Sequence, residues 1–362
     1  MSLSSESVRA ALAQIIDPHT QLDLVAMQSV RGVGVDGANV AIEIQLHYPA
    51  AGWHAALAGK IREAVQALPG AANVTVSIST RINSHRVQKD LTPLPGVKNI
   101  IAVASGKGGV GKSTTAVNLA LALAAEGAQV GVLDADIHGP SIPTMLGLSG
   151  KPESPDGKSI APKLSHGVQA MSIGLFLGED TPAIWRGPMT TQYLQQLLTT
   201  TLWQDLDYLV IDLPPGTGDI QLTLAQRVPV SAAIIVTTPQ DIALLDARRA
   251  LKMFEKVEVP VLGIVENMAV HVCSNCGHAE HIFGAGGGER MAAQYGVALL
   301  GSLPLDISIR ERADSGMPSV VSQPDSAIAA TYREIARTAA ARLSQQAKNK
   351  SIAFPNILIQ NT

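Results

Sequence analysis

The chain has 362 residues, of which 46% are hydrophobic and 16% are charged, and its formal net charge is −3. This composition is typical of a globular protein with a large core, and the small net charge excludes a strongly basic nucleic-acid-binding module. No apolar run reaches the roughly 18 residues that span a membrane, and the presence of only two cysteines excludes a disulfide scaffold.

The first 80 residues predict a small two-layer unit with the element order α-β-β-α-β. Apolar side chains recur at helical spacing in two stretches, and alternating runs flank Asp36-Gly37, a strong hairpin signal. The expected elements are a helix over residues 6–16, a hairpin from Val30 to Leu46, a helix from Trp53 to Leu68 and a strand from Asn73 to Ser79. Residues 81–98 are polar, contain two prolines and are expected to form a linker.

The stretch NIIAVASGKGGVGKSTT begins at Asn99 and predicts a nucleotide site. A buried strand, a glycine-rich loop and a helix follow one another, which is the context of a phosphate-binding loop. The glycines let backbone N–H groups turn toward an anion, and the helix adds the positive end of its dipole. Lys112 can reach the β- and γ-phosphates, and the Ser113 hydroxyl can bind Mg²⁺. The residues expected at the nucleotide are Gly106, Lys107, Gly108, Gly109, Val110, Gly111, Lys112, Ser113 and Thr114.

Strand and helix patterns alternate over residues 99–348, which predicts an α/β domain. Its sheet is expected to be mostly parallel with helices on both faces, and ligands should bind at the carboxyl ends of the strands. The last residues, 349–362, form an apolar tail. The further strands are expected at Gln129–Asp134, Val168–Ile173, Tyr208–Asp212, Ala232–Thr237, Val261–Asn267 and Ala298–Leu303, and helices at Met189–Thr199, Asp241–Glu255 and Asp325–Gln346.

Carboxylates follow two of these strands. Asp134 and Asp136 lie two apart on an extended segment, so both can face the phosphate loop, one near Mg²⁺ and the other near the attacking water. The alternative is a carboxylate pair that only caps the next turn. Asp212 ends a very apolar strand and is expected to bind Mg²⁺ through water. Gly216 and Gly218, in the loop after it, would let that loop change conformation when the γ-phosphate leaves.

Both cysteines of the chain form one pair, Cys273-x-x-Cys276. Three interpretations remain open for the pair. A redox pair normally opens a helix at the start of a βαβ unit, which does not fit this position. A zinc site could use His278 and His281 as further ligands. A [4Fe–4S] cluster takes four thiolates, which a two-fold dimer of this chain would supply.

The loop GKGGVGKST resembles the deviant Walker A loop of the family that contains the nitrogenase iron protein, the MinD and ParA ATPases and the Mrp/ApbC iron–sulfur carriers. The resemblance implies a homodimer in which Lys107 crosses to the nucleotide of the partner, although Lys107 could also be a solvated loop residue. It implies that Lys107, Lys112 and Asp136 are catalytic. It also makes Asn267 an adenine contact, with the loop around Pro304 on the other side of the base.

The cysteine loop resembles the CxxCG…IFG segment of the Mrp/ApbC carriers, whose cysteines bridge a cluster between subunits. With the motifs DADIHGPS, DLPPGTGD, ENM and IRERADSGMP, this similarity covers nearly all of residues 99–320. The first unit resembles the small domain of iron–sulfur assembly proteins through DPHTQLDLV, YPAAGW and LPG. It lacks the cysteine that this domain often carries, so a scaffold or docking role is expected.

These resemblances imply an ATP-hydrolysing homodimer that carries a [4Fe–4S] cluster between its subunits. Its cofactors would be ATP, Mg²⁺ and the cluster, and its partners a scaffold protein as donor and apo iron–sulfur proteins as recipients. The sequence shows no secretory signal, and we expect a cytoplasmic protein that binds neither nucleic acid nor membranes. The alternatives are a MinD/ParA-like positioning ATPase and a zinc-stabilised metallochaperone ATPase.

Overall fold

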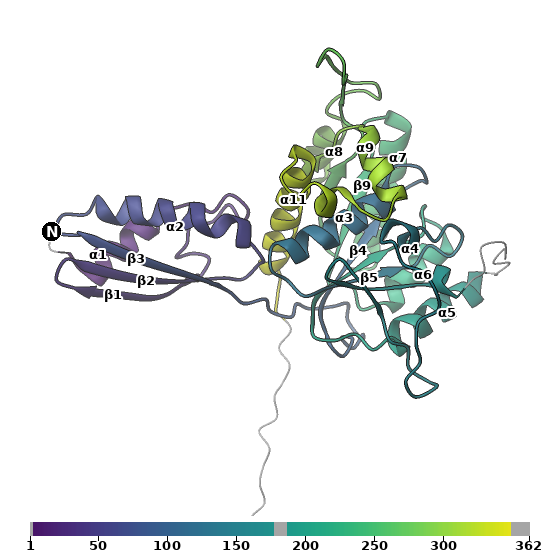
Figure 1. Ribbon diagram of the computed structural model, residues 1–362, viewed down its shortest axis with the longest axis horizontal. Helices are drawn as coiled ribbons and strands as arrows, with labels where there is room; N and C mark the ends of the chain where they lie inside the picture. The colour runs from purple at the N-terminus through teal and green to yellow at the C-terminus, as the bar shows by residue number, and fades with distance from the viewer. Residues whose placement is uncertain (1–2, 177–186, 349–362) are drawn as a thin grey trace, which may run out of the picture.

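The computed structural model describes residues 3–176 and 187–348, so the predicted tail, residues 349–362, lies outside the described residues. A small N-terminal unit extends sideways from a larger α/β unit (Figure 1). The order α-β-β-α-β predicted for the small unit is confirmed. Its elements are α1 (Ser5–Leu12), β1 (Val30–Asp36), β2 (Asn39–Leu46), α2 (Ala51–Gln66) and β3 (Asn73–Thr80).

The small sheet has two different faces. Strand β2 pairs antiparallel with β1 and parallel with β3, and its alternate side chains, from Val40 to Leu46, are fully buried under the helices. The first helix begins one residue earlier and ends four residues earlier than predicted, so Ile16 lies outside it and is 52% exposed. The Asp17 carboxylate accepts hydrogen bonds from the backbone N–H groups of His19 and Thr20, which holds the chain in a turn here.

The large unit contains an eight-stranded sheet in the order β13-β10-β9-β4-β8-β5-β7-β6. Every neighbouring pair is parallel except β6 and β7, so the mostly parallel sheet is confirmed. The strands are β4 (Val97–Ala104), β5 (Val130–Asp134), β6 (Lys163–Ser165), β7 (Val168–Ser172), β8 (Leu206–Asp212), β9 (Ala232–Thr237), β10 (Val261–Glu266) and β13 (Ala298–Ser302).

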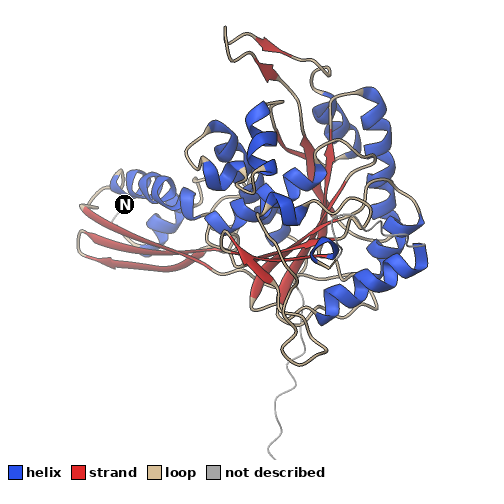
Figure 2. Ribbon diagram, turned by 45° about the vertical axis from the view of Figure 1, so that its right-hand side comes forward, coloured by secondary structure: helices blue, strands red, loops and turns tan. Residues whose placement is uncertain are grey.

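Helices cover both faces of this sheet, as predicted (Figure 2). Helices α3 and α11 share one hydrophobic cluster with one face, and α5, α6, α7 and α8 share another cluster with the opposite face. The helical elements are α3 (Lys112–Ala125), α4 (Ile142–Met145), η1 (Ile173–Leu175), α5 (Gly187–Thr200), α6 (Asp219–Arg227), α7 (Asp241–Lys256), α8 (Gly287–Tyr295), α9 (Ile307–Asp314), α10 (Ser319–Ser322) and α11 (Ala327–Ser344).

A polar network joins the two units. Glu126, which caps the end of α3, accepts a hydrogen bond from the backbone N–H of Gly52 at 2.8 Å and pairs with Arg337 of α11 at 3.1 Å. His19 lies 3.2 Å from Glu334 of the same helix. The hydrogen bond from His19 lowers the pKa of Glu334 to about 2. The helix that starts in the phosphate loop therefore ends against the small unit.

The segment between the units is packed against the large one. The backbone N–H of Arg86 donates to Ala347 O at 2.9 Å, and the Gln88 amide donates to Ala225 O at 2.7 Å. Strand β4 begins at Val97, so the last two residues of the predicted linker belong to the strand. Among the described residues, no helix combines the length and the apolarity that crossing a bilayer requires.

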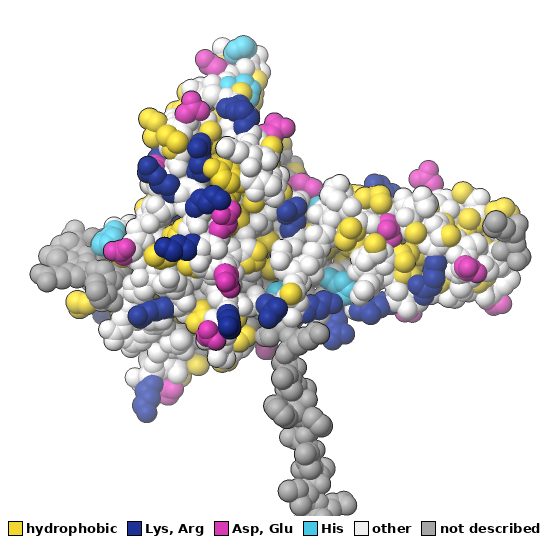
Figure 3. Space-filling view, turned by 180° about the vertical axis from the view of Figure 1, so that it is seen from behind, with side chains coloured by type: hydrophobic (Ala, Val, Ile, Leu, Met, Phe, Trp, Pro, Cys, Tyr) yellow, Lys and Arg dark blue, Asp and Glu magenta, His cyan; other side chains and the backbone are white. Residues whose placement is uncertain are grey.

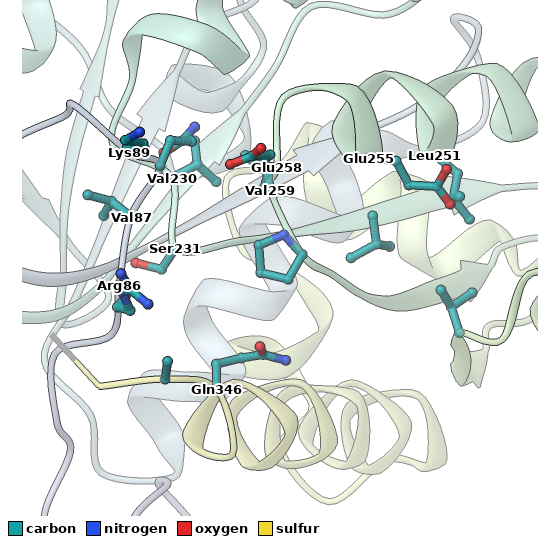
Figure 4. A pocket seen from close by; sticks show the side chains of 15 residues that line it. Arg86, Val87, Lys89, Val230, Ser231, Leu251, Glu255, Glu258, Val259 and Gln346 are labelled. Carbon is teal, nitrogen blue, oxygen red and sulfur yellow. The ribbon is translucent and has the colours of Figure 1, made fainter.

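A cavity of about 650 Å³ lies beside this segment (Figure 4). Arg86, Lys89, Glu255 and Glu258 are among the side chains that line it, so charges of both signs surround it. The cavity lies at the amino ends of β9, β10 and β13. Because parallel sheets of this kind bind their ligands at the carboxyl ends, the cavity is not the candidate site.

Candidate nucleotide site and cysteine hairpin

The phosphate loop connects β4 to α3 in the centre of the large sheet. Gly109 and Gly111 have φ values of +79° and +82°, in the left-handed region that favours glycine. A Cβ at Gly106 would overlap the backbone of Asp246 in α7, so the loop approaches that helix closely. Helix α3 begins at Lys112, and its first backbone N–H groups face the loop. The loop thus has the geometry of an anion cradle at a helix N-terminus.

Lys112 lies among the carboxylates that follow the neighbouring strands. Its Nζ is 2.6 Å from Asp212 Oδ1 and 3.7 Å from Asp136 Oδ2, and it donates to the Ser113 hydroxyl at 3.3 Å. The lysine is 6% exposed and Asp212 is fully buried. The structure therefore brings together four of the predicted site residues, which come from the phosphate loop, from the end of β8 and from the loop after β5.

Asp134 lies deeper in the same site and organises its surroundings. Its carboxylate accepts hydrogen bonds from the backbone N–H groups of Asp136 and Ile142 and from the Ser172 hydroxyl. Burial, and then the nearby Asp212 carboxylate, raise the pKa of Asp134 to about 7. Ser172 ends β7, the strand beside β5. This pairing could not be predicted from the sequence, because β7 becomes the neighbour of β5 only in the folded sheet.

The buried carboxylate of Asp212 is only partly satisfied. Burial raises its pKa, against the opposing effect of the Lys112 ammonium. Within the described residues, Asp212 Oδ2 is buried and has no hydrogen-bond partner. A buried carboxylate oxygen beside the Ser113 hydroxyl suits a hard divalent cation such as Mg²⁺, which prefers oxygen ligands.

The remaining residues predicted at the nucleotide lie around the rim of the loop. Lys107 is half-buried, and its Nζ is 3.4 Å from the Gln240 side chain, away from the cluster of carboxylates around Lys112. Asn267 donates from Nδ2 to Val110 O at 2.9 Å. Pro304 is half-buried and follows Leu303, whose backbone N–H donates to Glu266 O. The two residues expected on either side of the base thus lie on adjacent segments.

The turn at Gly111 gives the first testable prediction. Alanine at this position would have to adopt a left-handed φ, and its Cβ would overlap Asn267 Nδ2. We expect Gly111→Ala to lower the free energy of unfolding by about 2–3 kcal/mol, which urea titration measures. Gly109→Ala is the matched control, because it has the same kind of φ but no atom within 4 Å of the added Cβ. Equal losses in the two variants would contradict the overlap with Asn267.

The two cysteines lie on a hairpin that projects from the body of the protein. Strands β11 (His271–Val272) and β12 (Ala279–Glu280) pair antiparallel, and the projection is plain at the top of Figures 1 and 2. The backbone N–H of Cys273 donates to His278 O at 2.9 Å, and that of Gly277, at φ +71°, donates to Cys273 O at 2.8 Å. Sequence periodicity missed this hairpin, because two residues per strand give no measurable alternation.

Both thiols are free and accessible. Cys273 is half-buried and Cys276 is exposed, and the space-filling view shows histidine side chains on the same projection (Figure 3). Hydrogen bonds from the backbone N–H groups of Cys276 and Asn275 lower the pKa of the Cys273 thiol. The turn therefore favours a thiolate, which is the form that binds metal.

The hairpin does not complete a metal site within one chain. No group of three or more His, Cys, Asp or Glu side chains with metal-binding geometry occurs in residues 3–176 and 187–348. In particular, Cys273, Cys276, His278 and His281 do not form the four-ligand zinc site considered from the sequence, and the ring of His281 donates to Ala269 O at 2.7 Å. Within the described residues, the two thiols are therefore not joined by a third metal-binding side chain.

Comparison with known proteins finds relatives over both units. Residues 96–340 match the family model described as ParA, NUBPL iron-transfer P-loop NTPase, and residues 5–78 match the iron–sulfur cluster assembly protein model. The iron–sulfur cluster carrier protein of Escherichia coli strain K12 is 52% identical over 352 residues, which are 95% of this chain and 94% of the relative. The iron–sulfur cluster transfer protein NUBPL of Mus musculus is 51% identical over 266 residues, 73% of this chain and 83% of the relative.

A solved structure is similar to the large unit. It is a nucleotide-binding protein from Archaeoglobus fulgidus in complex with ADP, with a TM-score of 0.57 and 38% identity. The similarity covers 64% of this chain and 90% of that one. The fold, the geometry of the phosphate loop and the similarity to known proteins therefore all indicate the same kind of domain over the large unit.

Proposed function

The chain belongs to the ParA family of NUBPL-type iron-transfer P-loop NTPases, among whose members are iron–sulfur cluster carriers. On that premise we propose that it binds and hydrolyses ATP and that two copies hold one [4Fe–4S] cluster between them. A scaffold protein loads the cluster, and the dimer passes it to apo-proteins. The small unit, which has no cysteine, acts as a scaffold or docking module.

One observation carries the cluster proposal: an exposed hairpin presents two free thiols, and the part of the chain that the structure describes places no third metal-binding side chain in a group with them. A [4Fe–4S] cluster takes four thiolates, and two-fold symmetry turns two per chain into four. An accessible, two-point attachment in each subunit also suits a cluster that must leave again. A structural metal site would bury its ligands and complete its ligand set within the chain.

The nucleotide proposal rests on the contacts of Lys112. In the structure its ammonium neutralises Asp212, with 2.6 Å between Nζ and Oδ1. We propose that the ammonium turns to the β- and γ-phosphates when ATP enters, while Ser113 and Asp212 hold Mg²⁺, which neutralises phosphate charge. Asp136, whose carboxylate points toward the same lysine, orients the attacking water, and Lys107 reaches the nucleotide of the second subunit.

The proposed function also implies a cellular location and argues against nucleic acid and membranes as partners. Thiols that hold an iron–sulfur cluster must stay reduced, so we place the protein in the cytoplasm. The net charge of −3 offers no electrostatic attraction to nucleic acid, and we propose neither nucleic acid nor membrane as a partner.

Cluster transfer tests the proposed function directly. The cluster-loaded dimer is mixed anaerobically with an apo-aconitase, and the return of aconitase activity is followed with and without Mg-ATP. We expect activity to return, and its rate to depend on ATP in the wild type but not in Lys112→Gln. No transfer from a fully loaded dimer would overturn the carrier proposal, and equal rates in all four reactions would overturn the role of ATP.

A further inference from the structure

The segment that holds Asn267 continues directly into the cysteine hairpin, and the segment that holds Pro304 is hydrogen-bonded beside it before the chain enters α9 (Ile307–Asp314). Strands β10 and β13 end at Glu266 and Ser302, but the chain beyond them stays paired. We call residues 266–271 and 303–305 the connecting ribbon. Its backbone hydrogen bonds run from Leu303 N–H to Glu266 O (2.8 Å), from Ala269 N–H to Leu303 O (2.9 Å) and from Leu305 N–H to Val270 O (2.8 Å).

One end of the connecting ribbon touches the phosphate loop. Asn267 is 8% exposed, its amide donates to Val110 O at 2.9 Å, and it packs so closely on Gly111 that a Cβ there would overlap it. The amide of Asn267 is thus engaged with the loop itself in the structure. A base that takes the Nδ2 donor of Asn267 as its partner competes with the bond to Val110.

The other end of the ribbon is tied to both sides of the hairpin. His271, at the start of β11, donates from Nδ1 to Leu305 O at 3.0 Å. His281, directly after β12, donates from Nδ1 to Ala269 O at 2.7 Å. Each strand of the hairpin is therefore bonded to a different strand of the ribbon, and a movement of the ribbon moves the hairpin with it.

Met268 lies between Asn267 and Ala269 and has a φ of +57°. Side chains other than glycine rarely adopt this region unless surrounding contacts hold them there. Here the Asn267 bond to the phosphate loop acts on one side of Met268, and the Ala269 bond to Leu303 acts on the other. These contacts on both sides hold Met268 in this conformation, and we call the residue the joint of the ribbon.

We propose that Asn267, Met268 and His281 are positioning residues that couple nucleotide binding to the position of the two cysteines within one chain. A base that takes the amide of Asn267 releases the joint at Met268, and the ribbon carries this change through His281 to the hairpin. The nucleotide thereby sets how exposed the thiols are to a cluster donor or recipient. The inference rests on the proposed function for the place of the base and for the cargo of the hairpin.

The rate of thiol modification reports on the hairpin only, because the chain has no cysteine outside it. The rate of reaction of the metal-free protein with N-ethylmaleimide is followed by mass spectrometry, with and without saturating Mg-ADP. We expect ADP to change the rate constant about 2- to 10-fold, the range that one hydrogen bond contributes to an equilibrium. Because no iron is present, the result does not depend on whether the protein carries a cluster.

His281→Ala tests the proposed coupling path, because it removes the hydrogen bond between the hairpin and Ala269 of the connecting ribbon. We expect this variant to bind ADP like the wild type but to show a smaller effect of ADP on the thiols, because β12 loses its bond to the ribbon while β11 keeps the bond from His271 to Leu305. His278→Ala is the matched control, because it removes an exposed histidine from the same hairpin and leaves the bond to Ala269 intact. It should keep the full response to ADP.

The variant Lys107→Ala tests whether the effect of ADP on the thiols requires a dimer. Its mass in solution is measured under the same conditions. A response that persists in a monomeric Lys107→Ala chain supports coupling within one chain. The inference is overturned if saturating ADP leaves the wild-type rate unchanged, if His281→Ala responds like the wild type, or if the response disappears with Lys107. None of these outcomes touches the cluster proposal, which cluster transfer tests separately.

Discussion

Serine at both Cys273 and Cys276 should abolish cluster binding while leaving nucleotide binding intact. The hairpin is exposed and far from the hydrophobic clusters, so two oxygen-for-sulfur exchanges there should not affect folding. After anaerobic incubation with iron and sulfide, the wild type should bind about four irons per two chains and show a sulfide-to-iron absorption band near about 400 nm. The double variant should bind none and show no band, but should bind ADP with unchanged affinity.

A variant without two histidines of the hairpin distinguishes a cluster site from a zinc site. His278→Ala/His281→Ala removes the histidines that a single-chain zinc site would need, and it should retain the iron and the band. One tightly held zinc per chain, lost in the histidine variant and in the cysteine variant alike, would contradict the prediction and favour a zinc-stabilised ATPase. The mass in solution completes the test, because a cluster bridged by two Cys273–Cys276 pairs requires a dimer.

The sequence predicted the large unit well because its signals are local. Apolar runs appear in the structure as β5, β8 and β10 within two residues of the expected bounds, and the run from Ile100 to Ala104 appears as β4, which begins three residues earlier at Val97. The phosphate loop also contains its own chemistry, since the glycines, Lys112 and Ser113 are adjacent in the chain. A motif that is contiguous in sequence needs no knowledge of the fold to be recognised.

Features that depend on residues far apart could not be predicted in this way. The bond between Asp134 and Ser172 spans 38 positions, and the bond between Asn267 and Val110 spans 157. The network of His19 with Glu334 joins opposite ends of the chain. Each of these side chains is an ordinary polar residue in its local context, and only tertiary packing gives it a partner.

Asparagine at Asp136 should lower the rate of ATP hydrolysis by about 100-fold or more, the usual contribution of a group that positions or deprotonates the attacking water. The carboxylate lies 3.7 Å from Lys112 Nζ at the mouth of the site, where it can reach a water beside the γ-phosphate. Asparagine keeps the size of the side chain and removes its ability to accept a proton. Phosphate release under saturating Mg-ATP measures the loss.

Nucleotide affinity distinguishes this role from a structural one. Asp136 contributes its backbone N–H, and not its side chain, to the bond that organises the loop around Asp134, so the Asn variant keeps that bond. We therefore expect ADP to bind Asp136→Asn within about threefold of the wild type, a difference below 1 kcal/mol. Turnover close to that of the wild type would contradict the assignment of the water to Asp136.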